Sequence, residues 1–184
     1  MKLPRKSKKA FSGEIFDVYQ WPQKLYDGST ATFEKLKRPD TALIIPVLKD
    51  KVLLIGEDQP GKHYDYTLIG GRRDKSETPL QCAKREFLEE TGMMARCWEK
   101  LYSYQPLNKI EWTIYYFIAR DITKIQAPQL DPGEKIKLKP VSFDQFVKIY
   151  LRDLNQGHWL SFYLAKLKAE GKLNGFKKRL FPKL

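Results

Sequence analysis

Three glutamates near the middle of the chain have the type and spacing to bind metal together. Glu86, Glu89 and Glu90 are spaced i, i+3 and i+4, so in a helix their carboxylates share one face. Like charges at this spacing repel by roughly a few tenths of a kcal/mol, and the end of a helix disfavours negative charge. Because clustered carboxylate oxygens suit hard cations, the cluster predicts a Mg²⁺ site, with Mn²⁺ as an alternative, and a phosphorylated substrate. A solvated acidic face is the other interpretation.

A helix over Pro79–Thr91 is expected to position these carboxylates. Thr78 is a good N-cap, and Gln81 three residues later completes a capping box. Pro79 occupies the first helical position, where its missing N–H costs nothing. Gly92 is typical of the left-handed residue that ends a helix. The pattern therefore predicts a helix that ends beside the glutamates.

Two further residues precede the helix at fixed distances. Gly71 is followed after five residues by Glu77, and after seven more by the run REFLEETGM at 85–93. This order resembles the Nudix box, G-x5-E-x7-R-E-U-x-E-E-x-G-U, where U is a bulky apolar residue. Every fixed position matches, and Phe87 and Met93 fill the apolar positions. The chain resembles the Nudix hydrolases, and the predicted loop and capped helix give the motif its context.

The resemblance implies a metal-dependent hydrolase of nucleoside diphosphates linked to another group. Glu77 and Arg85 would form a supporting pair, with Arg85 orienting the glutamates. The metals would polarise the diphosphate and activate the attacking water. The metal ligands implied in this way are the Gly71 carbonyl oxygen and the carboxylates of Glu86, Glu89 and Glu90.

The resemblance leaves open which residue deprotonates the attacking water. In the ADP-ribose and nucleotide-sugar group of the family, this base often lies on a loop after the central sheet, and LDPGEKIKL at 130–138 resembles that loop. Glu134 is its one glutamate, whereas Pro132 stands where the group often has an acidic residue. The candidates are Glu134, Asp131 and Glu89, and an exposed loop glutamate without a catalytic role is the alternative for Glu134.

Two segments outside the box resemble the ADP-ribose and nucleoside-diphosphate-sugar pyrophosphatases. Residues 12–38 are similar to the small sheet that pairs two subunits in that group. QPLNKIEW at 105–112 is similar to its S-P-G-x-x-x-E loop, with Glu111 matching, while Gln105 and Leu107 depart from it. The resemblance implies a homodimer that cleaves ADP-ribose or another nucleotide sugar, such as GDP-mannose, into a nucleoside monophosphate and a sugar phosphate. Glu111 would contact the substrate.

The same group implies further substrate contacts. Its nucleobase stacks on aromatic side chains of the small sheet, partly from the other subunit, and Phe16 and Phe33 are the candidates here. Arg38 would lie near the phosphates or ribose. Arg72 and Arg73 could meet diphosphate oxygens, although adjacent side chains usually diverge and one of the two is then solvated. Core packing is the alternative role for Phe16.

The order of elements predicts an α+β sandwich. Together with the resemblance, it predicts a Nudix-type α/β/α sandwich with a mixed sheet and a small N-terminal antiparallel sheet. A basic tail at 1–11, a β subdomain at 12–40 and a Nudix domain at 41–184 are expected. The other expected elements are two strands around a turn at 26–28, a hairpin over 42–55, a loop at 57–65, strands at 66–69, 95–104, 112–120 and 136–139, and helices at 143–152 and 159–170.

Charge sets the remaining expectations. The net charge is +12, and much of it lies at the two ends, where solvated tails are expected. A positive protein attracts polyanions, which supports a pyrophosphohydrolase of RNA 5′ ends or dinucleoside polyphosphates. This function is an alternative, and the resemblance of residues 12–38 to the small sheet makes it less favoured. A catalytically silent nucleotide-binding Nudix module is a further one. The basic start lacks the apolar segment of a secretory signal, and no apolar run is long enough to span a membrane, so a cytoplasmic location is expected.

Overall fold

The computed structural model describes residues 2–152 and 159–182. Seven of the described strands form the main sheet, in the order β11-β5-β4-β10-β8, with β6 paired to β5 and β7 to β4. The β4–β10 pair is parallel, and the β4–β5 and β8–β10 pairs are antiparallel, so the predicted mixed sheet is confirmed. The strands are β4 (Thr41–Leu48), β5 (Lys51–Gln59), β6 (Lys62–Thr67), β7 (Ile69–Arg72), β8 (Met93–Tyr104), β10 (Ile114–Lys124) and β11 (Lys135–Val141).

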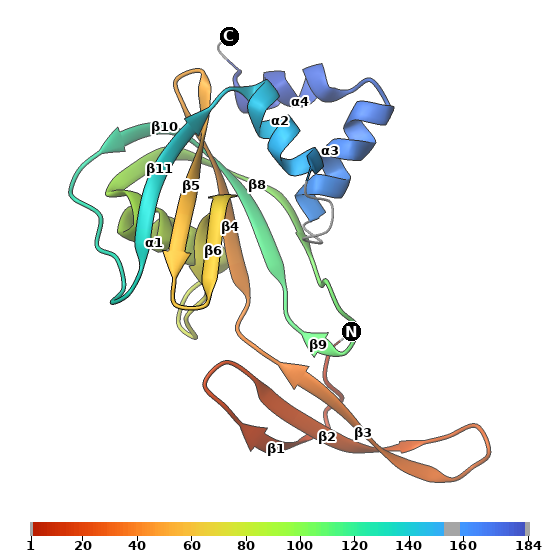
Figure 1. Ribbon diagram of the computed structural model, residues 1–184. Helices are drawn as coiled ribbons and strands as arrows, with labels where there is room; N and C mark the ends of the chain where they lie inside the picture. Colours follow the sequence, from red (N-terminus) through yellow and green to blue (C-terminus); the bar gives the residue numbers. More distant parts are fainter. Residues whose placement is uncertain (1, 153–158, 183–184) are drawn as a thin grey trace.

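Helices cover both faces of this sheet (Figure 1). One face carries α1 (Pro79–Thr91), and the other carries α2 (Phe143–Arg152), α3 (Trp159–Ala169) and α4 (Leu173–Leu180). The predicted α/β/α sandwich is therefore confirmed. Within the described residues, no helix is both long and apolar enough to cross a membrane.

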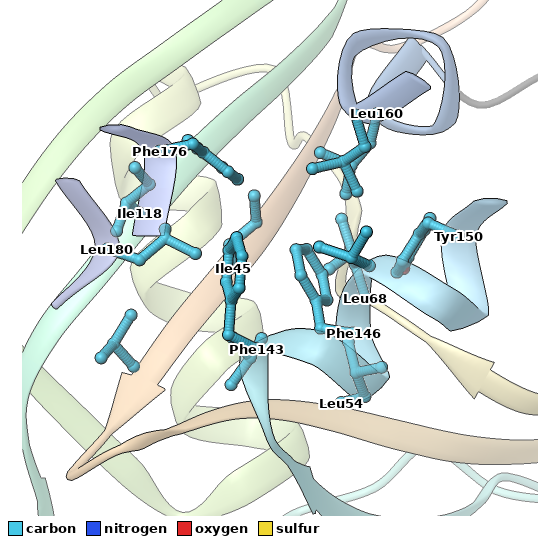
Figure 2. Packing of buried hydrophobic residues seen from close by; sticks show 14 of the residues in the cluster. Ile45, Leu54, Leu68, Ile118, Phe143, Phe146, Tyr150, Leu160, Phe176 and Leu180 are labelled. Carbon is cyan, nitrogen blue, oxygen red and sulfur yellow. The ribbon is translucent and has the colours of Figure 1, made fainter. Parts of the chain in front are cut away.

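Strand β4 divides the hydrophobic core into two layers. Alternate side chains of a strand point to opposite faces, so Ala42 and Ile44 pack with Phe87 of α1, while Ile45 and Val47 pack under the other helices. Figure 2 shows this second layer, in which side chains from the sheet meet those of α2, α3 and α4. Burial on both faces explains why β4 is a nearly continuous apolar run.

The smaller sheet differs from the expectation in two ways. It contains β1 (Lys8–Ser12), β2 (Asp17–Lys24), β3 (Thr30–Lys37) and β9 (Ile110–Glu111), and it projects from the sandwich (Figure 1). The predicted tail at 1–11 is wrong for residues 8–11, because Lys9 reaches Asp17 at 2.7 Å across the β1–β2 pair. The sheet is not wholly antiparallel either, because β9 runs parallel to β3 and lies outside the predicted 12–40 subdomain.

Two other expectations are also corrected. The loop predicted at 57–65 continues β5 and forms a hairpin with β6, turning at Pro60–Gly61. The basic C-terminal end, expected to be solvated, forms α4, because Phe176 and Leu180 are buried in the second core layer. In both segments charged residues lie next to buried ones. The charged residues obscure the apolar spacing that would have indicated a strand or a helix.

The predicted caps of α1 are confirmed. The Thr78 hydroxyl accepts a hydrogen bond from the Gln81 N–H at 3.2 Å, and the Gln81 side chain accepts one from the Thr78 N–H at 2.8 Å. Gly92 has a φ of 68°, and a Cβ atom there would lie 2.1 Å from the Gln126 carbonyl oxygen. Gly92 therefore lets the chain turn directly from α1 into β8.

Gly92→Ala should destabilise the fold far more than Gly171→Ala. Both glycines have a φ of 68°, but Gly171 has nothing within 4 Å of the added Cβ. The left-handed backbone alone costs roughly 1–2 kcal/mol for a residue with a side chain, and only Gly92 adds a clash with backbone. Urea denaturation of both variants measures the difference. Equal losses would show that the contact with Gln126 does not restrict the residue at position 92.

Candidate active site

The three glutamates of α1 line a cavity of about 430 Å³ at one edge of the main sheet. Besides α1, its walls come from β7 with the following loop, from the β5–β6 hairpin and from the loop at 129–134. Ile15 and Arg38 reach it from the side of the small sheet. The chain thus brings together residues separated by more than a hundred positions.

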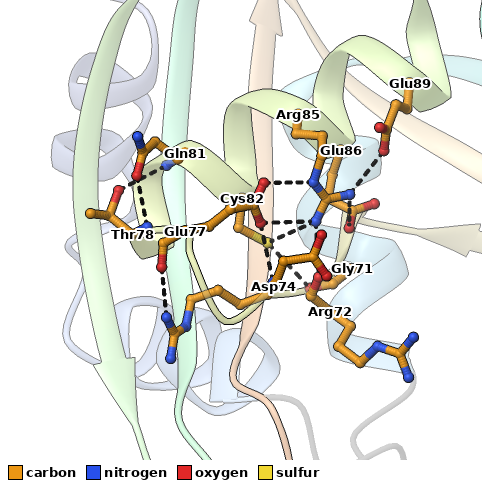
Figure 3. Close-up of polar contacts among 11 residues, drawn as sticks. Gly71, Arg72, Asp74, Glu77, Thr78, Gln81, Cys82, Arg85, Glu86 and Glu89 are labelled. Atoms are coloured by element: carbon orange, nitrogen blue, oxygen red, sulfur yellow. Dashed lines mark hydrogen bonds and ion pairs between the residues drawn. The ribbon is translucent and has the colours of Figure 1, made fainter.

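Arg85 organises most of the acidic side chains (Figure 3). Its Nε and Nη2 donate to the two carboxylate oxygens of Glu77 at 2.7 and 3.1 Å. Its Nη1 donates to Glu86 and to Glu89, each at 2.9 Å. The hydrogen bond from Arg85 lowers the pKa of Glu77, and the same bond raises the pKa of Arg85. The guanidinium therefore holds three carboxylates in fixed directions.

Glu90 has no such support. The residue is 8% exposed, its Oε1 accepts only a long bond of 3.4 Å from the Gly70 N–H, and its Oε2 has no partner among the described residues. Burial, then the nearby charges of Glu86 and Glu134, raise the pKa of Glu90 well above its ordinary value. Burial also raises the pKa of Glu86 to about 7, against the opposing effect of Arg85. An unpartnered buried carboxylate is costly, so this part of the cavity favours a cation.

The donor set suits a divalent metal. Its side-chain donors are carboxylate oxygens, and one of them has an unused, buried oxygen. Gly71 leaves room for close approach, because a Cβ atom there would lie 2.5 Å from Glu86 Oε1. Within the described residues, no three Asp, Glu, His or Cys side chains are already gathered at metal-binding positions.

Two arginines give the same cavity a positive wall. The Arg38 guanidinium stacks over Trp112 at 4.3 Å and over Phe16 at 5.5 Å, and its buried Nε has no partner among the described residues. Burial, and then the neighbouring charge of Arg72, lower the pKa of Arg38. Two neighbouring guanidinium groups, one of which has a buried donor without a partner among the described residues, fit an anion such as a diphosphate.

Three other residues that the sequence predicted to contact substrate do not line this cavity in a single chain. Arg73 contacts Asp40 at 3.3 Å and the Glu77 carbonyl oxygen at 2.6 Å, so it is Arg72 that lines the cavity. Phe33 packs edge-on against Trp21 in the small sheet. The remaining residue, Glu111, accepts hydrogen bonds from the Leu3 N–H and the Lys37 ammonium. The lining of the cavity in one chain does not include Phe33 or Glu111, so their contacts with substrate stay predictions.

Sequence reasoning missed one wall of the cavity. Glu57, Gln59 and Lys62 all line it, and Glu57 is buried. The expected loop at 57–65 concealed them, although a glutamate directly after the apolar run of β5 was a usable signal. The three candidate bases, Glu134, Asp131 and Glu89, also line the cavity.

Comparison with known proteins agrees with this geometry. Residues 37–167 match the family described as the NUDIX domain, and this span is most of the chain. The chain belongs to the Nudix family. An ADP-ribose pyrophosphatase of Bacillus subtilis (strain 168) is 24% identical over 145 residues, covering 76% of this chain and 77% of the relative. A methanol dehydrogenase activator of Bacillus methanolicus is 24% identical over 152 residues, covering 80% and 82%.

A solved structure supports the Nudix fold. The crystal structure of an ADP compounds hydrolase superposes with a TM-score of 0.67 at 20% identity, covering 91% of this chain and 95% of the other. This likeness shows the fold. The expected class of enzyme, a Nudix pyrophosphatase, is confirmed by the family match together with the pyrophosphatase relative.

Glu90→Gln should stabilise the metal-free protein. Because the pKa of folded Glu90 lies above its ordinary 4.5, the stability that the neutral acid provides is present below that pH and lost as the pH rises through the folded pKa. The amide avoids this loss and the repulsion from Glu86, so we expect a gain of about 1–3 kcal/mol at pH 8 in EDTA.

Thermal unfolding at pH 5 and pH 8 measures the effect of Glu90→Gln, and the gain should shrink at pH 5. Glu89→Gln is the control, because Glu89 is more exposed and its loss removes a bond to Arg85. An equal gain in both variants, or a gain for Glu90→Gln that does not depend on pH, would contradict the claim that the charged form of Glu90 destabilises the metal-free protein.

Proposed function

We propose that this Nudix hydrolase cleaves the pyrophosphate bond of ADP-ribose or another nucleoside diphosphate sugar, such as GDP-mannose, in a Mg²⁺-dependent reaction. The observation that carries the proposal is the buried carboxylate of Glu90 beside Glu86, one oxygen of which has no partner among the described residues, in a cavity that Arg38 and Arg72 also line. A cavity with a cation-binding side and an anion-binding side suits a metal diphosphate. The names of two similar proteins, an ADP-ribose pyrophosphatase and an ADP compounds hydrolase, support the same class of substrate.

Each residue then has a distinct task. The metal, Mg²⁺ or Mn²⁺, would be held by the Gly71 carbonyl oxygen and by Glu86, Glu89 and Glu90. When bound, it supplies Lewis-acid polarisation of the diphosphate and lowers the pKa of water. Arg85 and Glu77 keep the carboxylates aligned through the hydrogen bonds described above. Arg38 and Arg72 bind phosphate oxygens.

The reaction is a hydrolysis in which one phosphorus–oxygen bond replaces another. A base takes a proton from water as the water oxygen bonds to one phosphorus. The bond from this phosphorus to the bridging oxygen breaks, and the bridging oxygen leaves with the other phosphate. The products are a nucleoside monophosphate and a sugar phosphate. We assign the base to Glu134, because its carboxylate lines the cavity across from α1, with Asp131 and Glu89 as alternatives.

We further propose that two chains complete the substrate site. The small sheet projects from the sandwich and exposes large apolar side chains, among them Phe11, Ile15 and Phe33. In a homodimer, Phe33 of one chain would reach the nucleobase held by the other, and Phe16 would support it through Arg38. A cytoplasmic location remains a prediction from the sequence.

A second candidate function is favoured by the net charge of +12. Such a charge attracts nucleic acid, so RNA 5′ ends or dinucleoside polyphosphates are the alternative substrates. The small sheet and the ADP-ribose pyrophosphatase relative favour nucleotide sugars instead.

A substrate panel tests the proposed function. ADP-ribose, GDP-mannose, UDP-glucose, diadenosine polyphosphates and 5′-triphosphorylated RNA are incubated with millimolar Mg²⁺, and phosphate released by added phosphatase is measured. Hydrolysis should be fastest for ADP-ribose or GDP-mannose, should stop with EDTA, and should be abolished in Glu90→Gln with the fold intact. Activity on RNA ends without activity on nucleotide sugars would replace the proposal by its alternative.

Phe33→Ala should weaken substrate binding more than it slows the chemical step. Loss of one base–aromatic stack costs about 1–3 kcal/mol, so KM should rise at least about fivefold while kcat changes little. Phe162→Ala is the matched control, because Phe162 is exposed on α3, on the other side of the sheet from α1. Steady-state kinetics with the best substrate measures both, and an unchanged KM in Phe33→Ala would remove Phe33 from the binding site.

A further inference from the structure

A chain of four polar side chains links the β5–β6 hairpin to the loop that carries Glu134. Its members are Lys62 on β6, Glu57 and Gln59 on β5, and Glu134. All four line the cavity, on the walls that α1 does not supply. Lys62, Glu57 and Gln59 lie outside the Nudix box and have no role in the proposed function.

Glu57 is the fixed point of the chain. It is 8% exposed and lies within β5, which is paired with β6 and with β11 on its two sides. Its Oε1 accepts hydrogen bonds from the Lys62 ammonium at 2.5 Å and from the Gln59 side chain at 2.8 Å. The Lys62 charge compensates the buried carboxylate, so Glu57 stays in place beside the other acidic residues of the cavity.

Gln59 bridges two carboxylates with one nitrogen. Its Nε2 donates to Glu57 Oε1 at 2.8 Å and to Glu134 Oε1 at 2.6 Å. A side-chain amide nitrogen carries two hydrogens, so both are used in these bonds. The opposite orientation of the amide would turn its oxygen toward two negative charges. The chemistry therefore fixes the orientation of the amide and the distance between the two carboxylates.

Among the described residues, few other contacts set the position of the Glu134 carboxylate on its loop. The loop is tied by backbone bonds from the Gln129 N–H to the Glu89 carbonyl oxygen at 2.7 Å and from the Glu134 N–H to the Asp131 carbonyl oxygen at 3.0 Å. Neither bond involves the Glu134 side chain. Burial of Glu134 is only partial, and the preceding residue, Gly133, has a φ of 88°. The bond from Gln59 is thus the contact that aims the carboxylate into the cavity.

We propose that Gln59 is a positioning residue that holds the Glu134 carboxylate over the substrate diphosphate, with Glu57 and Lys62 fixing Gln59 in turn. The amide suits this place, because its nitrogen can donate to both carboxylates at once. The inference rests on the proposed function only through the role of Glu134 as the base. The tether itself is a property of the folded chain.

The test compares Gln59→Met with Gln59→Lys in the full-length protein. Methionine has a similar length but no donor, whereas the lysine ammonium can still donate to both carboxylates. We expect kcat to fall on the order of 10- to 100-fold in Gln59→Met, with KM within about twofold, because misplacing a catalytic group by about 1 Å has this effect. Gln59→Lys should retain kcat within about threefold, and thermal unfolding checks that both variants fold.

Two further readouts separate positioning from a general structural role. In a double-mutant cycle, Gln59→Met should slow Glu134→Gln no further, because Gln59 acts through that carboxylate. Hydrogen exchange by mass spectrometry should be faster for the backbone amides of 129–137 in Gln59→Met than in the wild type, and unchanged in α1. The exchange measurement needs no substrate.

The outcomes are distinct from those of the proposed function. Wild-type kcat in Gln59→Met, multiplicative effects in the cycle, or wild-type kcat in Glu134→Gln would overturn the positioning role, even in an active pyrophosphatase. If the wild type hydrolyses no nucleotide sugar, the proposed function fails, and exchange alone decides: faster exchange at 129–137 supports the tether, and unchanged exchange overturns it.

Discussion

The structure depends on how four carboxylates are kept near one another and partly out of water. Arg85 compensates three of them, Glu77, Glu86 and Glu89, through charge-assisted hydrogen bonds. Glu90 remains buried and without a full set of partners. Such an arrangement costs stability in the metal-free protein and is consistent with a site that gains its missing positive charge on binding. This electrostatic cost is confined to the last turns of α1, whose other face packs in the hydrophobic core.

The surrounding fold provides the rigidity that this arrangement needs. Phe87 anchors α1 to the sheet, and the strands β4 and β7 approach so closely that a Cβ atom at Gly70 would lie 2.0 Å from the Ala42 carbonyl oxygen. Gly92 then ends the helix where β8 must begin. Each of these contacts fixes the direction of the carboxylate face. The opposite wall includes the loop at 129–134, where the Glu134 side chain accepts a hydrogen bond from Gln59.

The parts of the site that follow from local rules were predictable. Capping by Thr78 and Gln81, the break at Gly92 and the spacing of the glutamates depend on residues within one helix, and each was found as expected. The strand β1, the hairpin of β5 with β6 and the helix α4 were not predicted. Their sequences are rich in charge and turn residues, which obscure the patterns of strands and helices. The strands β1 and β6 form by pairing with the neighbouring strand along the chain, and α4 forms because a few of its apolar side chains are buried in the core.

The sequence by itself determined the Nudix helix, its two caps and its carboxylate face, because short-range spacing and capping encode them. Only the tertiary structure decided which of the two loop arginines lines the cavity and that Gln59 meets Glu134 across 75 positions. It also decided that one oxygen of Glu90 has no partner among the described residues, while Arg85 holds the other glutamates. Those facts depend on strand register and on long-range contacts, since the direction of a side chain in space is set by the whole fold and not by its neighbours in sequence.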